Sequence, residues 1–168
     1  MNKQHGFTLV ELITVIILIG ILAMVALPKI NGSDDYEVYP FRAQLISALR
    51  LTQQRAMQYT DTNKDYCHQI VFDDAKVRYG VPDKTDCDVT IFPVSPEWQA
   101  DLTGAEVDSR YDITFDIDDK PNPKKIRFDY MGRPLDDCAN GCLINITQTT
   151  TAEIVTIKVE SEGFIHAL

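Results

Sequence analysis

Basic residues are scarce in this chain of 168 residues. Lys and Arg number 16 against 25 Asp and Glu, which gives a formal net charge of -9 and a pI of about 4.7. This shortage argues against a protein held mainly on the phosphates of a nucleic acid. Hydrophobic residues make up 45% and charged residues 24% of the chain. The chain is therefore not disordered, and its length favours one globular domain.

Catalytic signatures are also missing. The sequence contains no Gly-x-Ser-x-Gly, no phosphate-binding glycine loop and no zinc-protease motif. Of the histidines, His5 lies near the N-terminus, His68 in a predicted strand and His166 near the C-terminus. We therefore expect a protein that is not an enzyme and that holds no cofactor.

Charge is almost absent from the N-terminal segment. Between Phe7 and Leu27 the one charged residue is Glu11. A helix of this length spans roughly 30 Å, the thickness of a bilayer core. Lys3 precedes the apolar run, so the positive-inside tendency places the short tail in the cytoplasm and the rest outside. We therefore expect a single-pass anchor that carries an acidic, soluble head.

A cleavable secretory signal and a plain membrane anchor are two alternatives for this segment. No small-x-small cleavage site appears near Ala23 to Ala26, because Ile21 and Met24 occupy the positions that should be small. Glu11 counts against both alternatives. A carboxylate inside a membrane costs roughly 2.5–3.5 kcal/mol at mid-depth and is usually there for a partner.

The segment Gly6-Phe7-Thr8-Leu9-Val10-Glu11 follows a short basic leader and precedes an apolar helix, and it resembles the class III signal of type IV pilins and type II secretion pseudopilins. The resemblance implies that a prepilin peptidase cuts between Gly6 and Phe7 and methylates the amino group of Phe7. It implies an α+β pilin-like fold, in which a long N-terminal helix packs on an antiparallel β head. The implied partners are this peptidase, other major and minor pilins and an inner-membrane assembly platform. The implied location is the inner membrane, with the head in the periplasm, and later the filament.

Glu11 is the fifth residue after the implied cut, near the end of the helix that favours negative charge. In a filament it can pair with the Phe7 amine of a neighbouring subunit, which removes two unsatisfied charges from an apolar environment. Such a pair would set the axial register between apolar helices that are otherwise featureless. We expect Glu11 to be the assembly residue.

Four segments follow from this interpretation: a leader (1–6), a membrane and assembly helix (7–30), an amphipathic helix continuing into the head (31–60), and a β-rich head (61–168). Pro28 is expected to end or kink the first helix. The polar stretch at 31–40 leaves open whether the two helices are continuous.

The second helix is predicted to run through Tyr59, with Asp34 and Asp35 as candidate caps. Its apolar stripe at helical spacing consists of Phe41, Leu45, Ala48, Leu49, Thr52, Ala56 and Tyr59. The opposite side carries Arg50, Gln53 and Gln54, while Ile46 and Met57 are exposed apolar residues or contacts to other subunits. We expect this helix to lie under a sheet.

Alternating apolar and polar residues beyond Thr60 predict antiparallel strands with one buried face. The predicted strands lie at 69–72, 76–79, 113–117, 126–130, 144–147 and 155–160, with a short apolar run at 89–92 and a loop at 95–110. Turns at 73–75 and 119–123 are expected to connect neighbouring strands. A helix followed by strands is an α+β order.

The segment from Phe128 to Pro134, together with Gly163-Phe164-Ile165, is similar to minor pilins grouped with the pseudopilin-H and fimbrial-T proteins. Within that group the resemblance is closest to minor pilins of the mannose-sensitive haemagglutinin pilus system. It implies an assembly subunit that initiates a filament or lies at its tip. A type II secretion pseudopilin, and a tip-exposed module that binds a surface ligand or DNA, are the alternatives.

The four cysteines all fall in the predicted external head, where oxidation is possible. Three pairings exist, and we prefer the local one, Cys67–Cys87 with Cys138–Cys142. The intervening Asn140-Gly141 allows the second pair to close as a tight turn. A zinc site is the rival interpretation, but the sequence lacks closely spaced ligands for it.

Two clusters of charged residues are further candidates for binding sites. Asp116, Asp118 and Asp119 suggest calcium, but no Glu closes a calcium loop, so we expect solvated carboxylates and no metal. The basic residues Lys124, Lys125, Arg127 and Arg133 suggest DNA binding. The acidic head argues against that function, and no nucleic-acid partner is expected.

Overall fold

The computed structural model describes residues 8–30, 38–58, 67–93, 98–117 and 124–168, with the backbone alone for 23–30. Contacts divide the chain into two compact units, Met1–Tyr36 and Glu37–Leu168, and each is described by itself. Several residues named above lie outside the described residues: Gly6, Phe7, Asp34, Asp35, Tyr59, Asp118, Asp119 and the turn at 119–123.

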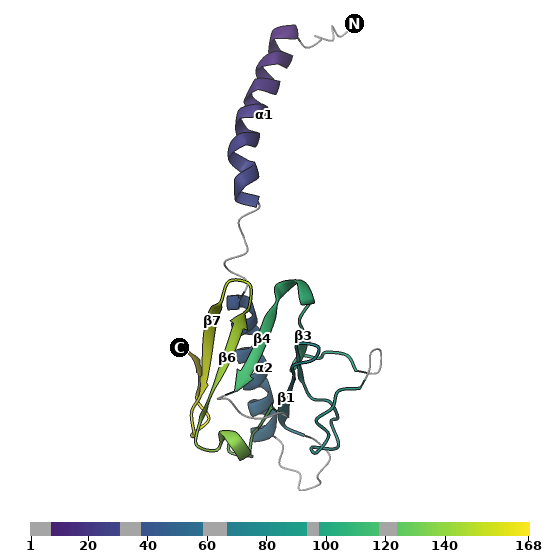
Figure 1. The fold of residues 1–168 in the computed structure, drawn as a ribbon, viewed down its shortest axis with the longest axis vertical. Helices are drawn as coiled ribbons and strands as arrows, with labels where there is room; N and C mark the ends of the chain where they lie inside the picture. Colours follow the sequence, from purple (N-terminus) through teal and green to yellow (C-terminus); the bar gives the residue numbers. More distant parts are fainter. Residues whose placement is uncertain (1–7, 31–37, 59–66, 94–97, 118–123) are drawn as a thin grey trace, which may run out of the picture. The chain divides into compact units, whose positions relative to one another are not determined.

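The first unit contains helix α1 (Leu9–Ile30) (Figure 1). The helix continues past Pro28, so it does not end at that proline, which was one of the two outcomes considered. A proline removes its own N–H donor, but the residues after it keep theirs and can still form helical hydrogen bonds. A kink at Pro28 stays a prediction. Among the residues whose side chains are described, no helix combines the length and the apolar character needed to cross a membrane.

Helix α2 (Val38–Gln58) begins the described part of the second unit. Its buried residues are Val38, Leu45, Ala48, Leu49, Thr52 and Ala56. The predicted stripe is therefore confirmed at all of its described positions except Phe41, which is partly buried and packs against the core. Ile46 is partly buried and packs against the core, so it is not the exposed residue that was considered, and a contact with another subunit stays a prediction. Met57 is exposed.

Two four-stranded antiparallel sheets make up the head (Figure 1). The first sheet has the order β3-β2-β1-β5, from Ala105–Glu106, Arg78–Gly80, Gln69–Asp73 and Lys124–Arg127. The second has the order β4-β6-β7-β8, from Ile113–Ile117, Cys142–Gln148, Glu153–Val159 and Ile165–Ala167. Short 3-10 helices occupy Ser109–Tyr111 and Asp136–Cys138.

One predicted hairpin is confirmed, and a second hairpin joins two predicted strands whose pairing was not predicted. β1 pairs with β2 across the predicted turn, with Phe72 opposite Tyr79. β6 and β7 pair over their whole length, and buried residues alternate along both, as the period of two predicted. The α+β class with an N-terminal helix and antiparallel sheets therefore agrees with the structure.

One predicted pairing is wrong. Strands β4 and β5 were expected to form a hairpin, but β4 pairs with β6 and β5 pairs with β1 in the other sheet. Alternation of apolar residues tells which face of a strand is buried, but it does not tell which strand lies beside it. The run at 89–92 forms no strand, and the segment predicted as a loop contains the short β3.

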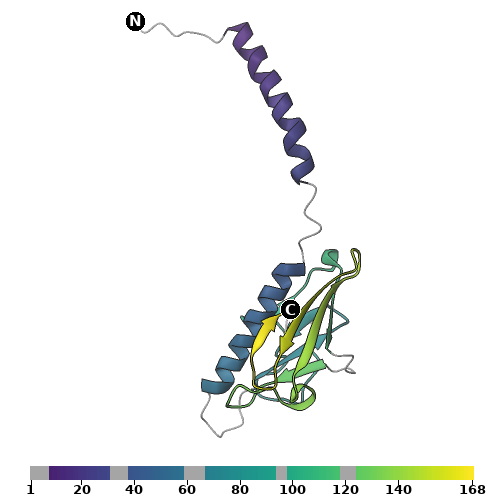
Figure 2. The same cartoon turned by 90° about the vertical axis from the view of Figure 1, so that its left-hand side faces the viewer.

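The core lies between α2 and the two sheets, because α2 contacts β6, β7 and β8 of one sheet and β1 of the other (Figure 2). Leu45 and Leu49 from α2 are fully buried, and each such side chain contributes about 1.5–3 kcal/mol. The sheets meet at Phe115 of β4, whose ring centroid lies 5.5 Å from that of Tyr79 in β2. These contacts fix the head as one body, on which loops and surface residues are positioned.

Candidate assembly segment and head surfaces

Thr8 directly precedes helix α1 and caps it. Its side-chain Oγ1 accepts a hydrogen bond from the Glu11 N–H at 3.2 Å, and its carbonyl accepts one from Leu12 N–H at 3.2 Å. This is the N-cap geometry that satisfies a donor at the start of a helix. The Thr-x-x-Glu spacing is the sequence signal of such a cap, and the sequence interpretation overlooked it. Gly6 and Phe7, the predicted processing residues, lie outside the described residues.

Glu11 lies in the first turn of α1, where the helix dipole favours a negative charge. Every side chain from Thr8 to Leu22 is exposed. The large apolar ones cover all sides of the helix: Leu9, Val10, Leu12, Ile13, Val15, Ile16, Ile17, Leu18, Ile19, Ile21 and Leu22. A helix that is apolar all round is stable only where something else covers it, such as other helices or lipid. The arrangement is therefore suited to packing, with one carboxylate near its start.

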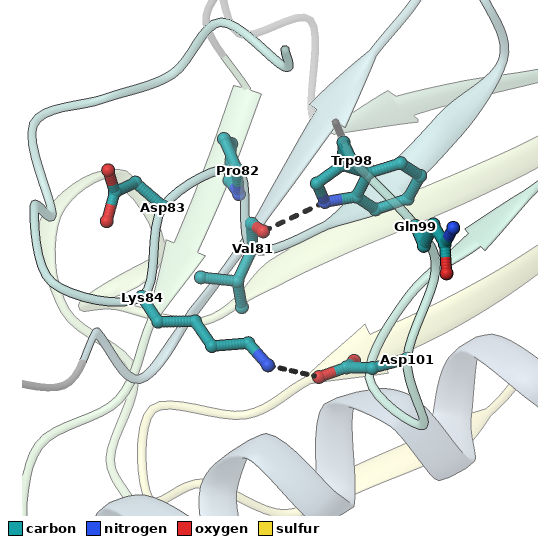
Figure 3. Close-up of a pocket in the computed structure, with 7 residues that line it drawn as sticks. All are labelled: Val81, Pro82, Asp83, Lys84, Trp98, Gln99 and Asp101. Atoms are coloured by element: carbon teal, nitrogen blue, oxygen red, sulfur yellow. Dashed lines mark hydrogen bonds and ion pairs between the residues drawn. The ribbon is translucent and has the colours of Figure 1, made fainter. Parts of the chain in front are cut away.

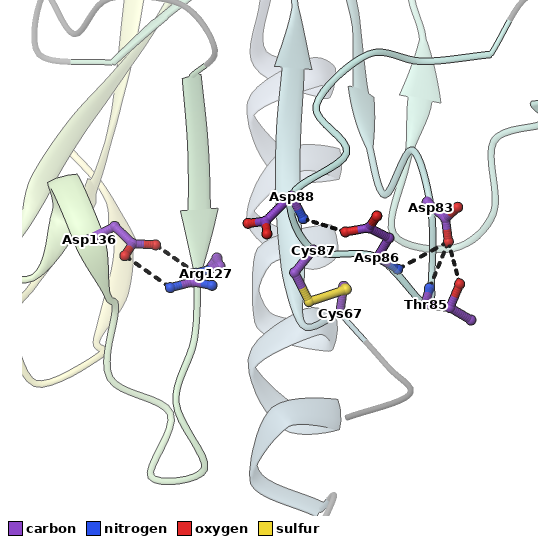
Figure 4. The surroundings of a disulfide bond; sticks show 8 residues. All are labelled: Cys67, Asp83, Thr85, Asp86, Cys87, Asp88, Arg127 and Asp136. Atoms are coloured by element: carbon purple, nitrogen blue, oxygen red, sulfur yellow. Dashed lines mark hydrogen bonds and ion pairs between the residues drawn. A yellow bond between two sulfur atoms is a disulfide. The ribbon is translucent and has the colours of Figure 1, made fainter. Parts of the chain in front are cut away.

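The structure joins Cys67 to Cys87 and Cys138 to Cys142, the pairing preferred from the sequence. The Cα atoms are 5.2 Å and 5.1 Å apart, within the usual range for disulfides. In the shorter loop, Gly141 has a φ of 85°, which glycine adopts without strain, and its N–H donates to the Cys138 carbonyl at 2.8 Å. Figure 4 shows the longer-loop disulfide beside a series of aspartate-capped turns.

The predicted basic patch is largely neutralised by ion pairs. Arg127 binds both oxygens of Asp136, at 2.6 Å and 3.0 Å (Figure 4). Arg133 pairs with Asp129 at 2.9 Å. Lys124 is only 11% exposed and contacts two aspartates. These three side chains bind carboxylates of the head, and the absence of a nucleic-acid partner stays a prediction.

Of the acidic cluster considered for calcium, Asp116 lies among the described residues, and Asp118 and Asp119 lie outside them. Asp116 pairs with Lys124 at 3.1 Å, so its carboxylate already has a cation. Within the described ranges, no group of His, Cys, Asp and Glu side chains has the arrangement of a metal site.

The two described histidines lie in different surroundings. Burial lowers the pKa of His68, and the positive charge of Arg55 lowers it further. His166 Nε2 lies 3.2 Å from Glu160 Oε1.

A polar seam on α2 holds the C-terminal segment of the head. Gln53 Nε2 donates to the carbonyls of Gly132 and Gly163, each at 2.6 Å. Arg50 donates to the carbonyl of Ile165 at 2.7 Å. Gln53 and Arg50 were predicted to lie on the side of the helix away from the stripe. Instead they bind the turns and the edge strand β8, which has too few residues to show an alternating pattern.

The segment after β2 and the segment around Trp98 enclose an open pocket of about 560 Å³. Trp98 donates its indole N–H to the Val81 carbonyl at 3.0 Å (Figure 3). On another side of the pocket, Lys84 pairs with Asp101 at 3.3 Å. The sequence interpretation assigned no site here, because these residues follow no regular spacing.

A model of the prokaryotic N-terminal methylation motif matches residues 1–27. The chain is also 51% identical over 51 residues to a fimbrial protein of Moraxella nonliquefaciens. The matched stretch is 30% of this chain and 29% of the relative. It is 43% identical over 58 residues to a type IV major pilin protein of Neisseria gonorrhoeae, covering 34% of this chain and 32% of the relative. No solved structure matches the chain.

Each of these relatives matches about a third of this chain, and the chain spans less than a third of the length of either. By these similarities the chain is type IV pilin-like, and it carries the N-methylation motif. The matched range includes Gly6, Phe7 and Glu11, and their roles in processing and assembly stay predictions.

Proposed function

We propose that this protein is a minor type IV pilin, a structural subunit that enters a filament through its N-terminal helix. The observation that carries the proposal is the methylation motif at residues 1–27, continuous with a helix whose described side chains are apolar on all sides except at Glu11 and a few small residues. A prepilin peptidase cuts between Gly6 and Phe7 and methylates Phe7. The chain waits in the inner membrane with its head in the periplasm, and then joins other pilins at the assembly platform.

Glu11 sets the register of assembly in this account. Thr8 caps the helix, and Glu11 lies in its first turn, four residues after Phe7 in the sequence. An unpaired carboxylate among apolar helices is costly, and an amine of a neighbouring subunit is the partner that offsets that cost. The pairing gives the correct axial position an advantage over every other position along a uniform apolar surface.

The minor role and the mannose-sensitive haemagglutinin type are the finer parts of the proposal. They are supported by the resemblance of the segments 128–134 and 163–165 to such minor pilins. Gln53 binds a glycine carbonyl in each of these segments, which is consistent with their forming one structural unit. A type II secretion pseudopilin would use the same N-terminal chemistry and is one alternative, and a tip-exposed module that binds a surface ligand or DNA is the other. We also propose that the head is not catalytic, because the sequence contains no Gly-x-Ser-x-Gly, phosphate-binding glycine loop or zinc-protease motif.

Filament fractionation tests the proposal. The chain is produced, with an epitope tag, in cells that assemble a type IV pilus, and the sheared filaments are examined by immunoblot. We expect the chain in the filament fraction and a strong reduction for Glu11→Gln. The matched control is Glu106→Gln, which removes the same charge from an exposed position in the head. Absence of the unaltered chain from the filaments would contradict the function, whereas normal assembly of Glu11→Gln would contradict only the register role.

A further inference from the structure

The loop closed by the Cys138–Cys142 disulfide contains the dipeptide Asn140-Gly141, and the filament role makes no use of its chemistry. Asn140 is exposed, so water reaches its side-chain amide. In an Asn-Gly pair the backbone nitrogen of the glycine can attack the amide carbon of the asparagine side chain, because a glycine has no Cβ to hinder the approach. The dipeptide is therefore a candidate for chemical modification.

The fold requires a glycine at position 141. Its φ of 85° lies in the left-handed region, which other residues rarely adopt. A Cβ atom there would lie 3.0 Å from the carbonyl oxygen of Val159 and 3.3 Å from the backbone nitrogen of Ser161. The turn and the close approach to the end of β7 therefore keep an Asn-Gly pair in this loop.

The same loop holds the attacking nitrogen in a hydrogen bond. Gly141 N–H donates to the carbonyl of Cys138 at 2.8 Å, and the disulfide fixes the Cα atoms of Cys138 and Cys142 at 5.1 Å. The nitrogen can attack only after it gives up its proton, and this hydrogen bond keeps the proton in place. The short covalent ring also restricts the backbone rotation that would bring the nitrogen to the amide carbon.

We propose that Asn140 is a site of spontaneous deamidation, which the Cys138–Cys142 disulfide keeps closed. When the disulfide is open, the Gly141 nitrogen loses its proton to solvent and forms a bond to the side-chain amide carbon of Asn140, and ammonia leaves. Water then opens the five-membered succinimide ring to aspartate or isoaspartate. The reaction consumes water and needs no oxidant or reductant.

The site is open in a newly made chain until the cysteines are oxidised, so the modification records how long that took. The product carries a new carboxylate. Asn140 lines a pocket of about 450 Å³ together with Lys158 and Glu160, which pair at 2.9 Å, so the new carboxylate competes with Glu160 for the ammonium. The proposal goes beyond the filament role and does not depend on it, because these residues all lie in the head.

Ageing of the full chain tests the proposal. The unaltered chain and the double variant C138S/C142S are purified in detergent and incubated in mildly alkaline buffer. The peptide that contains Asn140 is then analysed by mass spectrometry, and isoaspartate is detected by enzymatic methyl labelling. Peptides are needed because Asn31-Gly32 is a second such pair in the sequence. We expect Asn140 to deamidate about tenfold faster in the variant, the rate effect of losing one hydrogen bond that must break before attack.

Two comparisons separate the loop from general unfolding. The variant C67S/C87S opens the other disulfide and leaves this loop closed, so its Asn140 should react as slowly as in the unaltered chain. In guanidinium chloride, where every chain is unfolded, the unaltered oxidised chain should still react more slowly at Asn140 than C138S/C142S, because its covalent ring persists.

Three results overturn the proposal. The first is an Asn140 that stays intact in C138S/C142S. The second is a C67S/C87S variant that deamidates Asn140 as fast as C138S/C142S in the absence of denaturant. The third is an equal rate at Asn140 for the unaltered chain and C138S/C142S, with or without denaturant.

Discussion

Lys124 Nζ lies 3.1 Å from Asp116 Oδ1, and this contact joins the two sheets of the head, because Lys124 belongs to β5 and Asp116 to β4. The same ammonium lies 3.2 Å from Asp74 Oδ2 and donates to the carbonyl of Phe115 at 3.2 Å. The sequence placed Lys124 in a surface patch, but in the structure its side chain links the two sheets of the head. Its ammonium also donates to a backbone carbonyl of β4. Because β4 lies at the edge of its sheet, this hydrogen bond protects that edge from pairing with another chain.

Replacing this lysine should therefore destabilise the head. For Lys124→Met we expect a loss of about 1–3 kcal/mol in the free energy of unfolding, because two carboxylates and a carbonyl lose their partner while keeping partial access to water. Urea unfolding of the full chain, followed by Trp98 fluorescence, gives the measurement. The control Lys76→Met changes an exposed lysine and should stay within about 0.5 kcal/mol. Equal stabilities for the two variants would show that the contact does not fasten the sheets.

Gln53 is expected to contribute far more to the stability of the head than its neighbour Gln54. Gln53→Ala leaves the carbonyls of Gly132 and Gly163 without their donor, which should cost about 1–3 kcal/mol. Gln54→Ala removes an exposed amide of the same size from the same helix, and should cost less than about 0.5 kcal/mol. The same urea experiment compares them. A Gln53→Ala protein as stable as Gln54→Ala would rule out the polar seam as a source of stability.

The two disulfides should contribute unequally. They close loops with sequence separations of 20 and 4 residues. In the chain-entropy model this predicts about 3 kcal/mol for Cys67–Cys87 and about 2 kcal/mol for Cys138–Cys142. Unfolding of the double variants C67S/C87S and C138S/C142S under identical conditions checks the order. A larger loss for the shorter loop would contradict the entropic explanation.

Asp129 should make the head sensitive to acid. Burial raises its pKa, but hydrogen bonds from the Arg133 backbone and side chain and from the Met131 N–H outweigh that effect, so the pKa lies below the usual value. The folded protein therefore binds this proton less readily than the unfolded chain. The stabilisation is present above about pH 4 and is lost as the pH falls through the folded pKa.

The variant Asp129→Asn tests this linkage. We expect it to be less stable than the unaltered chain at neutral pH, and to lose less stability between about pH 5 and about pH 2. The control is Asp137→Asn, at an exposed aspartate of the neighbouring 3-10 helix. If Asp129→Asn and the unaltered chain lose stability in parallel with falling pH, the lowered pKa of Asp129 is not a source of acid sensitivity.

Much of the fold follows from local pattern, and the errors occur where partners are distant in sequence. The helical spacing of Leu45, Ala48, Leu49 and Thr52 identified the buried face of α2. The alternation in β6 and β7 identified the buried face of each strand, although their pairing with each other was not predicted. For β5 the choice was open, and its partner is β1, more than fifty positions earlier in the sequence. No local signal specifies such a pairing.

The partners of the polar side chains were harder to predict from the sequence than the buried apolar positions. Gln53 and Lys124 look like surface residues in the sequence, and only the tertiary fold brings carbonyls and carboxylates to them. The pocket at Trp98 likewise depends on segments that are joined by turns without periodicity. The assembly segment is different, because the residues that define it are neighbours in the sequence. The Thr8 cap was missed there, even though its spacing to Glu11 was visible.

The most direct test of the central claim is the mass of the chain made with and without an active prepilin peptidase. Intact mass and N-terminal peptide analysis should show loss of residues 1–6 and a single methyl group on Phe7 when the peptidase is present. The uncut chain should be found when it is absent. The same mass in both preparations would contradict the account that this protein is processed and assembled as a type IV pilin.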